Sequence, residues 1–286
     1  MNTTYSSIRK TFENSLNSLY EENEIKALFY FYFEEKWKVK KFEMSLHPDT
    51  VIEPRMEEEI EQDLQRLDRG EPVQYVTGST TFYNLPFRVS PVVLIPRPET
   101  EELVQWTLRR AETVNRPLRI LDFCTGSGAI AVALACHLPD ATVYATDYAE
   151  EVLQFARKNA GLNNADVHFL KHDLLRDGIG AFDTSFDIIV SNPPYIPLSR
   201  KSQLHTNVAD FEPSVALFVP DEEAIVFYER IAVLGRDLLK KNGCLCFETH
   251  EDFQEEIVIK LKNLSYHNIN MMEDINGNPR FISCTK

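Results

Sequence analysis

The sequence has little cysteine and no long apolar run. Its five cysteines among 286 residues form no C-x-x-C pair, which disfavours a disulfide framework or a bound metal. No stretch reaches the ~20 apolar residues that cross a membrane. The amino terminus also lacks the apolar core of a secretory signal. We therefore expect a cytoplasmic protein that holds no metal.

An excess of positive charge is absent as well. The chain carries 30 lysine and arginine residues against 44 aspartate and glutamate residues, for a formal net charge of -14. Proteins that bind duplex nucleic acid usually present a basic surface that neutralises phosphates. Direct binding of nucleic acid is therefore not expected.

Glycine does not occur before Gly70, and the region that precedes it reads as helical and acidic. An aromatic and aliphatic stripe crosses residues 23–42, and Gly70 is suited to ending the last helix. The stripe fits the core of a small bundle, with a docking surface for a partner protein as the alternative. We predict a helical domain at residues 1–75, followed by a linking β-hairpin at residues 76–98, where glycine and proline interrupt short β-prone runs.

Strand and helix patterns alternate in the remaining region, residues 99–286. This alternation predicts an α/β fold, a doubly wound and mostly parallel sheet that binds ligands at the carboxyl ends of its strands. The last two strands are separated by the turn sequence INGNP and should pair as an antiparallel hairpin. The seven expected strands are 118–123, 141–147, 166–173, 186–192, 244–250, 268–274 and 280–286, and the helices between them are 128–138, 149–162, 222–243 and 252–264.

The first of these strands runs into a glycine-containing turn that opens a helix. Gly126 and Gly128 allow a tight turn and a close approach of the backbone to a ligand. Asp147 ends the next strand, 21 residues after Gly126. A carboxylate there can accept both ribose hydroxyls of a cofactor that contains adenosine. The alternative is that Asp147 only caps the following helix.

Two cofactors suit this arrangement, a nicotinamide dinucleotide and S-adenosylmethionine. Asp122, just before the turn, matches the positively charged amino group of the methyl donor better than it matches a pyrophosphate. Asp173 is placed to bond the adenine edge, with Leu174 beside it as an apolar cover, although Asp173 can equally cap the next turn. The glycine turn by itself leaves the choice of cofactor open.

The expected strand 186–192 ends in an Asn-Pro-Pro-Tyr sequence. The side-chain oxygen of Asn192 and the backbone carbonyl of Pro193 can each accept an N–H from one planar amide or amine. Pro193 and Pro194 make the turn rigid, and Tyr195 can stack on the flat group. Such preorganised acceptors orient a weakly nucleophilic nitrogen toward a methyl group. The alternative is a rigid surface turn without chemistry.

These motifs resemble class I S-adenosylmethionine-dependent methyltransferases that act on amide or exocyclic amino nitrogens. More narrowly, the chain resembles the HemK/PrmC family, which methylates the glutamine of the GGQ motif in peptide-chain release factors. The resemblance covers essentially the whole chain and includes three further segments, residues 69–103, 191–197 and 211–217. It implies a Rossmann-like domain with a seven-stranded sheet, S-adenosylmethionine as cofactor and a release factor as protein partner.

Family roles carried over by position fall on matching residues. Asp147 takes the ribose and Leu174 the adenine side, while Asn192 borders the cofactor. The glutamine clamp maps onto residues 192–195, namely Asn192, Pro193, Pro194 and Tyr195. The cofactor loop maps onto Cys124, Thr125, Gly126, Ser127 and Gly128.

The chain departs from the family pattern at two places. Cys124 stands where the family loop usually has glycine. Residues 247–253, FETHEDF, replace a continuation that usually contains glycine. Neither departure touches the predicted amide clamp.

Three alternatives remain beside glutamine methylation. An adenine-N6 methyltransferase uses a similar Asn-Pro-Pro-aromatic clamp, but it must flip a base and bind phosphates. A nicotinamide dehydrogenase has only the glycine spacing in its favour, and a binding module with a vestigial site would have no need of an intact motif set. For the leading function, we hypothesise that residues 1–75 dock the release factor while its GGQ loop enters the cleft.

Overall fold

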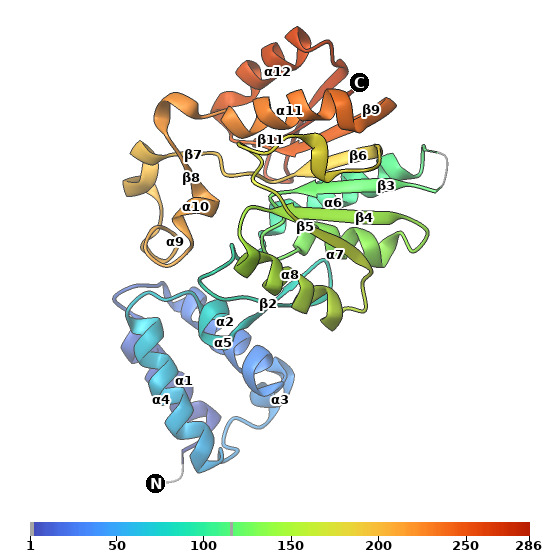
Figure 1. Cartoon of the computed structure of the whole chain (residues 1–286). Coiled ribbons are helices and arrows are strands. Elements are labelled where there is room, and N and C mark those ends of the chain that lie inside the picture. Colours follow the sequence, from blue (N-terminus) through green and yellow to red (C-terminus); the bar gives the residue numbers. More distant parts are fainter. Residues whose placement is uncertain (1–2, 115–116) are drawn as a thin grey trace.

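The computed structural model describes residues 3–114 and 117–286. The amino-terminal region folds into a helical bundle at one end of the molecule (Figure 1). Gly70 has the left-handed conformation (φ +86°) just beyond the last long helix of the bundle, as expected of a helix end. The bundle contains α1 (Tyr5–Leu16), α2 (Glu22–Tyr32), α3 (Lys41–Leu46), α4 (Pro54–Asp68) and α5 (Val73–Thr77), with a π-helical turn at Phe33–Trp37 after α2.

Aromatic side chains fill the centre of this bundle. Phe12, Phe29 and Phe33 are buried, and Phe29 meets Phe12 edge to face at 5.5 Å between ring centroids. The Tyr32 hydroxyl donates to buried Asp63 at 2.7 Å, which satisfies both polar groups inside an apolar core. The aromatic stripe predicted from the sequence therefore contributes mainly to core packing.

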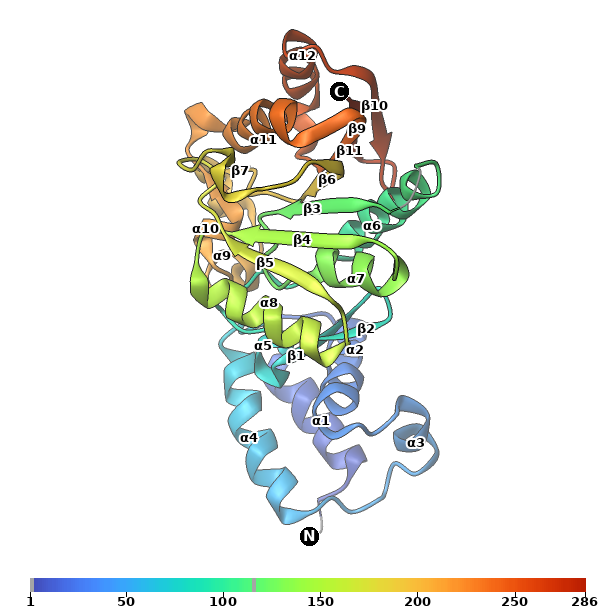
Figure 2. The same cartoon turned by 45° about the vertical axis from the view of Figure 1, so that its right-hand side comes forward.

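A two-stranded antiparallel hairpin follows the bundle. Its strands are β1 (Ser79–Phe82) and β2 (Leu85–Arg88), joined by a tight turn at Tyr83 and Asn84. Both turn residues have positive φ, the geometry that matches the twist of a two-residue hairpin. The hairpin separates the bundle from the larger sheet (Figure 2). The division at residues 75 and 98 into separate domains stays a prediction.

The predicted seven-stranded, mostly parallel sheet is confirmed. Its strand order is β10-β11-β9-β6-β3-β4-β5, with β11 antiparallel to both of its neighbours, so the last two strands pair as a hairpin as predicted. The strands are β3 (Arg119–Phe123), β4 (Thr142–Asp147), β5 (Val167–Lys171), β6 (Phe186–Ser191), β9 (Leu239–Glu248), β10 (His267–Glu273) and β11 (Pro279–Thr285).

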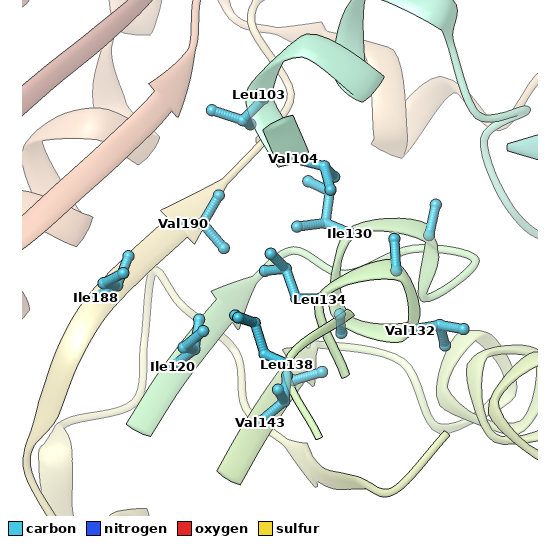
Figure 3. Close-up of a cluster of buried hydrophobic side chains, with 14 of the residues drawn as sticks. Leu103, Val104, Ile120, Ile130, Val132, Leu134, Leu138, Val143, Ile188 and Val190 are labelled. Carbon is cyan, nitrogen blue, oxygen red and sulfur yellow. The ribbon is translucent and has the colours of Figure 1, made fainter. Parts of the chain in front are cut away.

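Helices cover both faces of this sheet, and each face has its own apolar core. Alternate side chains of a strand point to opposite faces, so Ile188 and Val190 of β6 join one core while Ile189 joins the other. Phe186 also joins the core of Ile189, because the register of β6 is irregular between Phe186 and Ile188. Figure 3 shows the first core, where residues of β3, β4 and β6 meet α6 and α7. The covering helices are α6 (Pro98–Ala111), α7 (Ala129–His137) and α8 (Glu150–Leu162) on one face, and α11 (Val226–Leu238) and α12 (Gln254–Asn263) on the other.

The helix expected at residues 222–243 is wrong at both ends, because α11 begins at Val226 and ends at Leu238. Leu239 already pairs with Phe186, so β9 begins before the strand expected at residues 244–250. An irregular register follows, with Asn242 at φ +63°, and Lys240 reaches the buried carboxylate of Asp187 at 2.6 Å. These tertiary contacts override the helical periodicity of the local sequence.

A long connection between β6 and α11 lies beside the carboxyl ends of the strands (Figure 1). It contains β7 (Ile196–Pro197) and β8 (Phe218–Val219), which pair in parallel, and the short helices α9 (Thr206–Ala209) and α10 (Ser214–Leu217). Within residues 3–114 and 117–286, no helix has both the length and the apolar character needed to span a membrane.

Candidate functional site

A cavity of about 440 Å³ opens at the carboxyl ends of β3, β4, β5 and β6. This is where doubly wound sheets bind ligands, and its volume lies in the range of small-molecule sites. Several segments that are far apart in the sequence form its lining. The lining comprises residues 92–94, 96, 97, 100, 124–127, 129, 130, 146–148, 152, 172–175, 192, 194, 215, 216, 218–220, 223, 226 and 227.

The turn after β3 forms one wall of the cavity. Cys124, Thr125, Gly126 and Ser127 all line it, and the backbone N–H of Thr125 donates to the Thr146 carbonyl at 2.9 Å. Cys124 has a left-handed backbone conformation (φ +58°) that favours glycine. This conformation gives a physical reason why the resembled loops usually carry glycine at that position.

Gly128 is not in the lining but behind it. Its φ of +83° is left-handed, and a Cβ built on it would lie 3.1 Å from the Cβ of Ala156 in α8. Glycine is therefore required here for the packing of the turn against α8. The role of Gly128 in the cofactor loop stays a prediction.

Asp147 ends β4 and faces the cavity from a buried position. Its two carboxylate oxygens accept backbone N–H bonds, from Gly126 at 3.0 Å and from Tyr148 at 2.9 Å. The N–H of Ala149 also acts on this carboxylate. An ionised carboxylate has about four acceptor positions, so one remains for a ligand hydroxyl. Burial raises the pKa of Asp147 and the backbone hydrogen bonds oppose that rise. The first residue outside α8 is Ala149, so Asp147 is not its N-cap.

Asp122 lies beneath the turn and has no exposed surface. It is not part of the cavity lining, and its carboxylate accepts a hydrogen bond from the Thr125 hydroxyl at 2.6 Å. Burial raises the pKa of Asp122 to about 7, with the bond from Thr125 acting in the opposite direction. Asp122 thus supports the turn from behind, and its expected contact with a cofactor amino group stays a prediction.

The end of β5 supplies the opposite wall. Asp173 and Leu174 both line the cavity, with Leu174 buried. An oxygen of Asp173 also accepts the backbone N–H of Leu175 at 3.2 Å, so the turn-capping role considered from the sequence is present as well. The ring of His172, which sequence reasoning missed, lines the same wall and leans on Phe123.

The Asn-Pro-Pro-Tyr turn closes the end of the cavity nearest to β6. Asn192 and Pro194 line it, and Pro193 is buried behind them. The Asn192 amide donates from Nδ2 to the Thr100 hydroxyl at 3.1 Å. Tyr195 is not in the lining, because its hydroxyl is held by Glu248 at 3.1 Å. Its predicted stacking on a substrate stays a prediction.

The cavity lining contains the positively charged side chain of Arg97. Among the described lining residues Arg97 is the only arginine or lysine, and it pairs with the buried carboxylate of Glu212. Glu212 also accepts the backbone N–H of Ile95 at 3.2 Å. These bonds fasten the segment before α6 to the long connection after β6, so two distant stretches form one wall.

Sequence reasoning missed several residues in or beside the cavity that contact the predicted site residues or each other, namely Thr100, Glu248, Arg97 and Glu212. Each lies inside a stretch that carried the family resemblance or departed from it: residues 69–103, 211–217 and 247–253. The stretches were recognised, but no spacing within them shows that Thr100 and Glu248 meet, since 148 positions separate them in the chain.

Two family models match the chain. Residues 106–210 match the methyltransferase small domain, and residues 8–78 match the PrmC N-terminal domain. A crystal structure of a methyltransferase from Pyrococcus furiosus superposes with a TM-score of 0.52 at 20% sequence identity, covering 71% of this chain and 90% of that one. At that identity the superposition shows the shared fold alone.

Closer relatives cover nearly the full length. The release factor glutamine methyltransferase of Flavobacterium psychrophilum is 39% identical over 276 residues, which is 96% of this chain and 96% of the relative. The protein of the same name from Bacteroides thetaiotaomicron is 40% identical over 273 residues, 95% of this chain and 96% of the relative. The chain therefore belongs to the release factor glutamine methyltransferase family.

Proposed function

We propose that this enzyme transfers a methyl group from S-adenosylmethionine to the side-chain amide nitrogen (N5) of the glutamine in the GGQ motif of peptide-chain release factors. One observation carries the proposal: Asn192, at the start of the amide clamp, lines the same cavity as Asp147 and the glycine-containing turn. Family membership supplies the substrate class.

The lining suits the cofactor. Asp147 would hold the ribose hydroxyls, the turn at residues 124–128 would lie along the methionine portion, and Asp173 with Leu174 would contact the adenine. Leu174 offers an apolar surface for the adenine ring, and the carboxylate of Asp147 can accept the ribose hydroxyls. When bound, S-adenosylmethionine supplies a methyl group activated by its sulfonium.

The clamp residues act on the substrate amide. An amide nitrogen is a poor nucleophile because its lone pair is delocalised into the carbonyl. The Asn192 side-chain oxygen and the Pro193 carbonyl would each accept one N–H of that nitrogen, which orients it and favours positive charge on it. The surplus proton then leaves to solvent or to a neighbouring carbonyl, so a strong general base is not required.

A protein substrate is favoured over adenine in a nucleic acid. The net charge of -14 and the single lining arginine, already paired with Glu212, leave little positive charge to neutralise phosphates near the cavity. In this proposal residues 1–75 dock the release factor, residues 76–98 link, and residues 99–286 catalyse. Because release factors act in translation, the proposed compartment is the cytoplasm.

A methyl-transfer assay tests this function. Labelled S-adenosylmethionine is incubated with the enzyme and a purified release factor whose GGQ glutamine is either intact or changed to alanine. Label on the intact factor alone is the expected result. Label on neither factor, together with label on DNA or RNA supplied in parallel, would instead identify adenine methylation.

A further inference from the structure

Two buried polar side chains, those of Thr100 and Glu248, form a hydrogen-bonded chain with the Asn192 amide. The hydroxyl of Thr100, in the first turn of α6, donates to the Glu248 carboxylate at 2.6 Å. The same hydroxyl oxygen accepts a hydrogen bond from Nδ2 of Asn192 at 3.1 Å. Thr100 and Glu248 are buried, at 5% and 2% exposure, so little of either side chain is open to water.

The order of donors in this chain has a consequence for Asn192. A hydroxyl has one proton, and the Thr100 proton is directed to a carboxylate that can only accept. The Thr100 oxygen can therefore only accept from its other neighbour, which must be the NH2 group of the Asn192 amide. The amide carbonyl of Asn192 is then turned away from Thr100 and remains free to accept an N–H at the cavity.

The same carboxylate holds the other end of the turn. Its second oxygen accepts the Tyr195 hydroxyl at 3.1 Å, and the backbone carbonyl of Glu248 accepts the Tyr228 hydroxyl at 3.1 Å. Glu248 thus ties Asn192, through Thr100, and Tyr195 directly to the end of β9. Two positions of the clamp that are three residues apart share one anchor.

We propose that Thr100 and Glu248 are positioning residues that fix the orientation of the Asn192 amide, so that its oxygen rather than its nitrogen faces the substrate amide. The proposal rests on the proposed function and deepens it. Neither residue touches the reacting atoms. Both determine whether Asn192 accepts a hydrogen bond from the substrate, as catalysis needs, or donates one.

The arrangement depends on Glu248 being ionised. A protonated Glu248 can donate to Thr100, and the Thr100 proton is then free to donate to the Asn192 oxygen, which reverses the amide. Burial raises the pKa of Glu248, while hydrogen bonds from Thr100 and Tyr195 and the charge of Arg280 lower it and the charge of Glu99 raises it. Turnover should therefore fall as the pH falls through the pKa of Glu248.

The matched test compares threonine substitutions on one helix. Thr100→Val removes the hydroxyl at constant shape, Thr100→Ser keeps it, and Thr107→Val is the control. Thr107 is equally buried in α6, but its hydroxyl donates to the Leu103 carbonyl at 2.8 Å, away from the cavity. We expect Thr100→Val to lower kcat by roughly 10- to 100-fold, with the cofactor Kd and thermal stability close to those of Thr107→Val. Thr100→Ser should recover most of the loss.

The pH profile of kcat supplies a readout that a merely structural role would not move. Wild-type enzyme should show an acidic limb that Glu248→Gln removes, because glutamine has no carboxyl proton to gain. Retention of the same limb in Glu248→Gln would overturn the proposal. So would equal kcat values for Thr100→Val and Thr107→Val, or equal losses in Thr100→Val and Thr100→Ser.

A measurement without substrate separates this inference from the proposed function. In nitrogen-15 NMR spectra the Asn192 side-chain NH2 signal, identified by its loss in Asn192→Ser, should show slow proton exchange in wild type and Thr107→Val and fast exchange in Thr100→Val. Unchanged exchange in Thr100→Val would overturn the positioning role. If the wild-type enzyme modifies no release factor, the proposed function is overturned instead. The NMR signal would still show how the Asn192 amide is oriented.

Discussion

Three buried carboxylates near the cavity differ in role because they differ in what they can reach. Asp147 faces the cavity with an acceptor position left for a ligand, whereas Asp122 is enclosed under the turn and bonds to Thr125. Glu248 lies behind the clamp and bonds to Thr100 and Tyr195. All three have raised pKa values from burial, so charge alone does not distinguish ligand contact from support.

Substitution of Asn192 and of Asp147 should separate turnover from cofactor binding. Asn192→Ala removes an acceptor for the substrate amide and should lower kcat by about 10²- to 10³-fold while the cofactor Kd stays within a few fold. Asp147→Ala removes the expected ribose contacts and should raise the cofactor Kd by roughly 10- to 100-fold. Calorimetric titration of the cofactor and steady-state kinetics measure the two effects. Equal changes in cofactor affinity for both variants would contradict this division.

Replacing Asp122 should alter how stability depends on pH. The pKa of Asp122 is about 7 in the folded protein, well above the ordinary unfolded value near 4. The folded state therefore binds the extra proton between these values, and the stability it confers at low pH is lost as the pH rises toward 7. The Asp122→Asn variant has no carboxyl group at this position, so its stability does not fall in this way as the pH rises.

Urea unfolding at several pH values measures the effect. Relative to wild type, Asp122→Asn should gain about 2–4 kcal/mol in unfolding free energy as the pH is raised from about 4 to above 7. The isosteric amide can still accept the Thr125 hydroxyl, which keeps the comparison matched. A constant difference across this range would show that Asp122 does not titrate as described.

The turn between β3 and α7 joins two elements through backbone geometry rather than side chains. Gly126 and Gly128 both have positive φ, but only Gly128 abuts another element, the helix α8 at Ala156. A Cβ added at Gly126 would meet no described atom within 4 Å apart from those of its chain neighbours. One glycine therefore serves the turn and the other serves helix packing.

Alanine at each glycine should distinguish these two requirements. Gly128→Ala adds a close contact with α8 to an unfavourable backbone conformation and should cost about 2–4 kcal/mol of stability. Gly126→Ala has only the backbone cost of about 1 kcal/mol, but its methyl group lies at the cavity wall and should weaken cofactor binding. Denaturant midpoints and cofactor Kd values test both statements. Equal losses of stability in the two variants would mean that α8 moves away from the new methyl group without a loss of folding free energy.

The bundle contacts both the hairpin and the long connection that lines the cavity. The rings of Tyr20 in the bundle and His205 in the long connection stack with centroids 6.2 Å apart. The hydroxyl of Ser79 in the hairpin donates to the Glu35 carboxylate at 2.9 Å. Figure 1 shows the bundle next to α9 and α10, on the side of the molecule where the strands end. A protein that reached the cavity with one loop would be able to touch the bundle at the same time.

Loss of the bundle should therefore matter for a whole protein substrate. A chain that lacks residues 1–75 should lose much more kcat/KM on an intact release factor than on a short peptide containing GGQ. A docking surface adds binding energy only for the larger substrate. Steady-state assays with both substrates measure this difference, and circular dichroism of the shortened chain checks its folding. An unchanged rate on the intact factor would exclude the docking role.

Local patterns in the sequence determined much of this protein. Alternating strands and helices indicated the sheet, because side-chain periodicity and turn residues act over a few positions. The glycine-containing turn, Asp147, Leu174 and Asn192 were all identified from their places after strands, since parallel strands bring their carboxyl ends to one edge. Those residues indeed line one cavity.

Only the tertiary structure decided which residues support them. Thr100 and Glu248 meet across 148 positions, and Arg97 meets Glu212 across 115. Burial placed Asp122 behind the turn instead of in the lining, and strand pairing with β6 ended α11 at Leu238. Long-range contacts of this kind depend on how whole layers pack, which no short stretch of one sequence encodes.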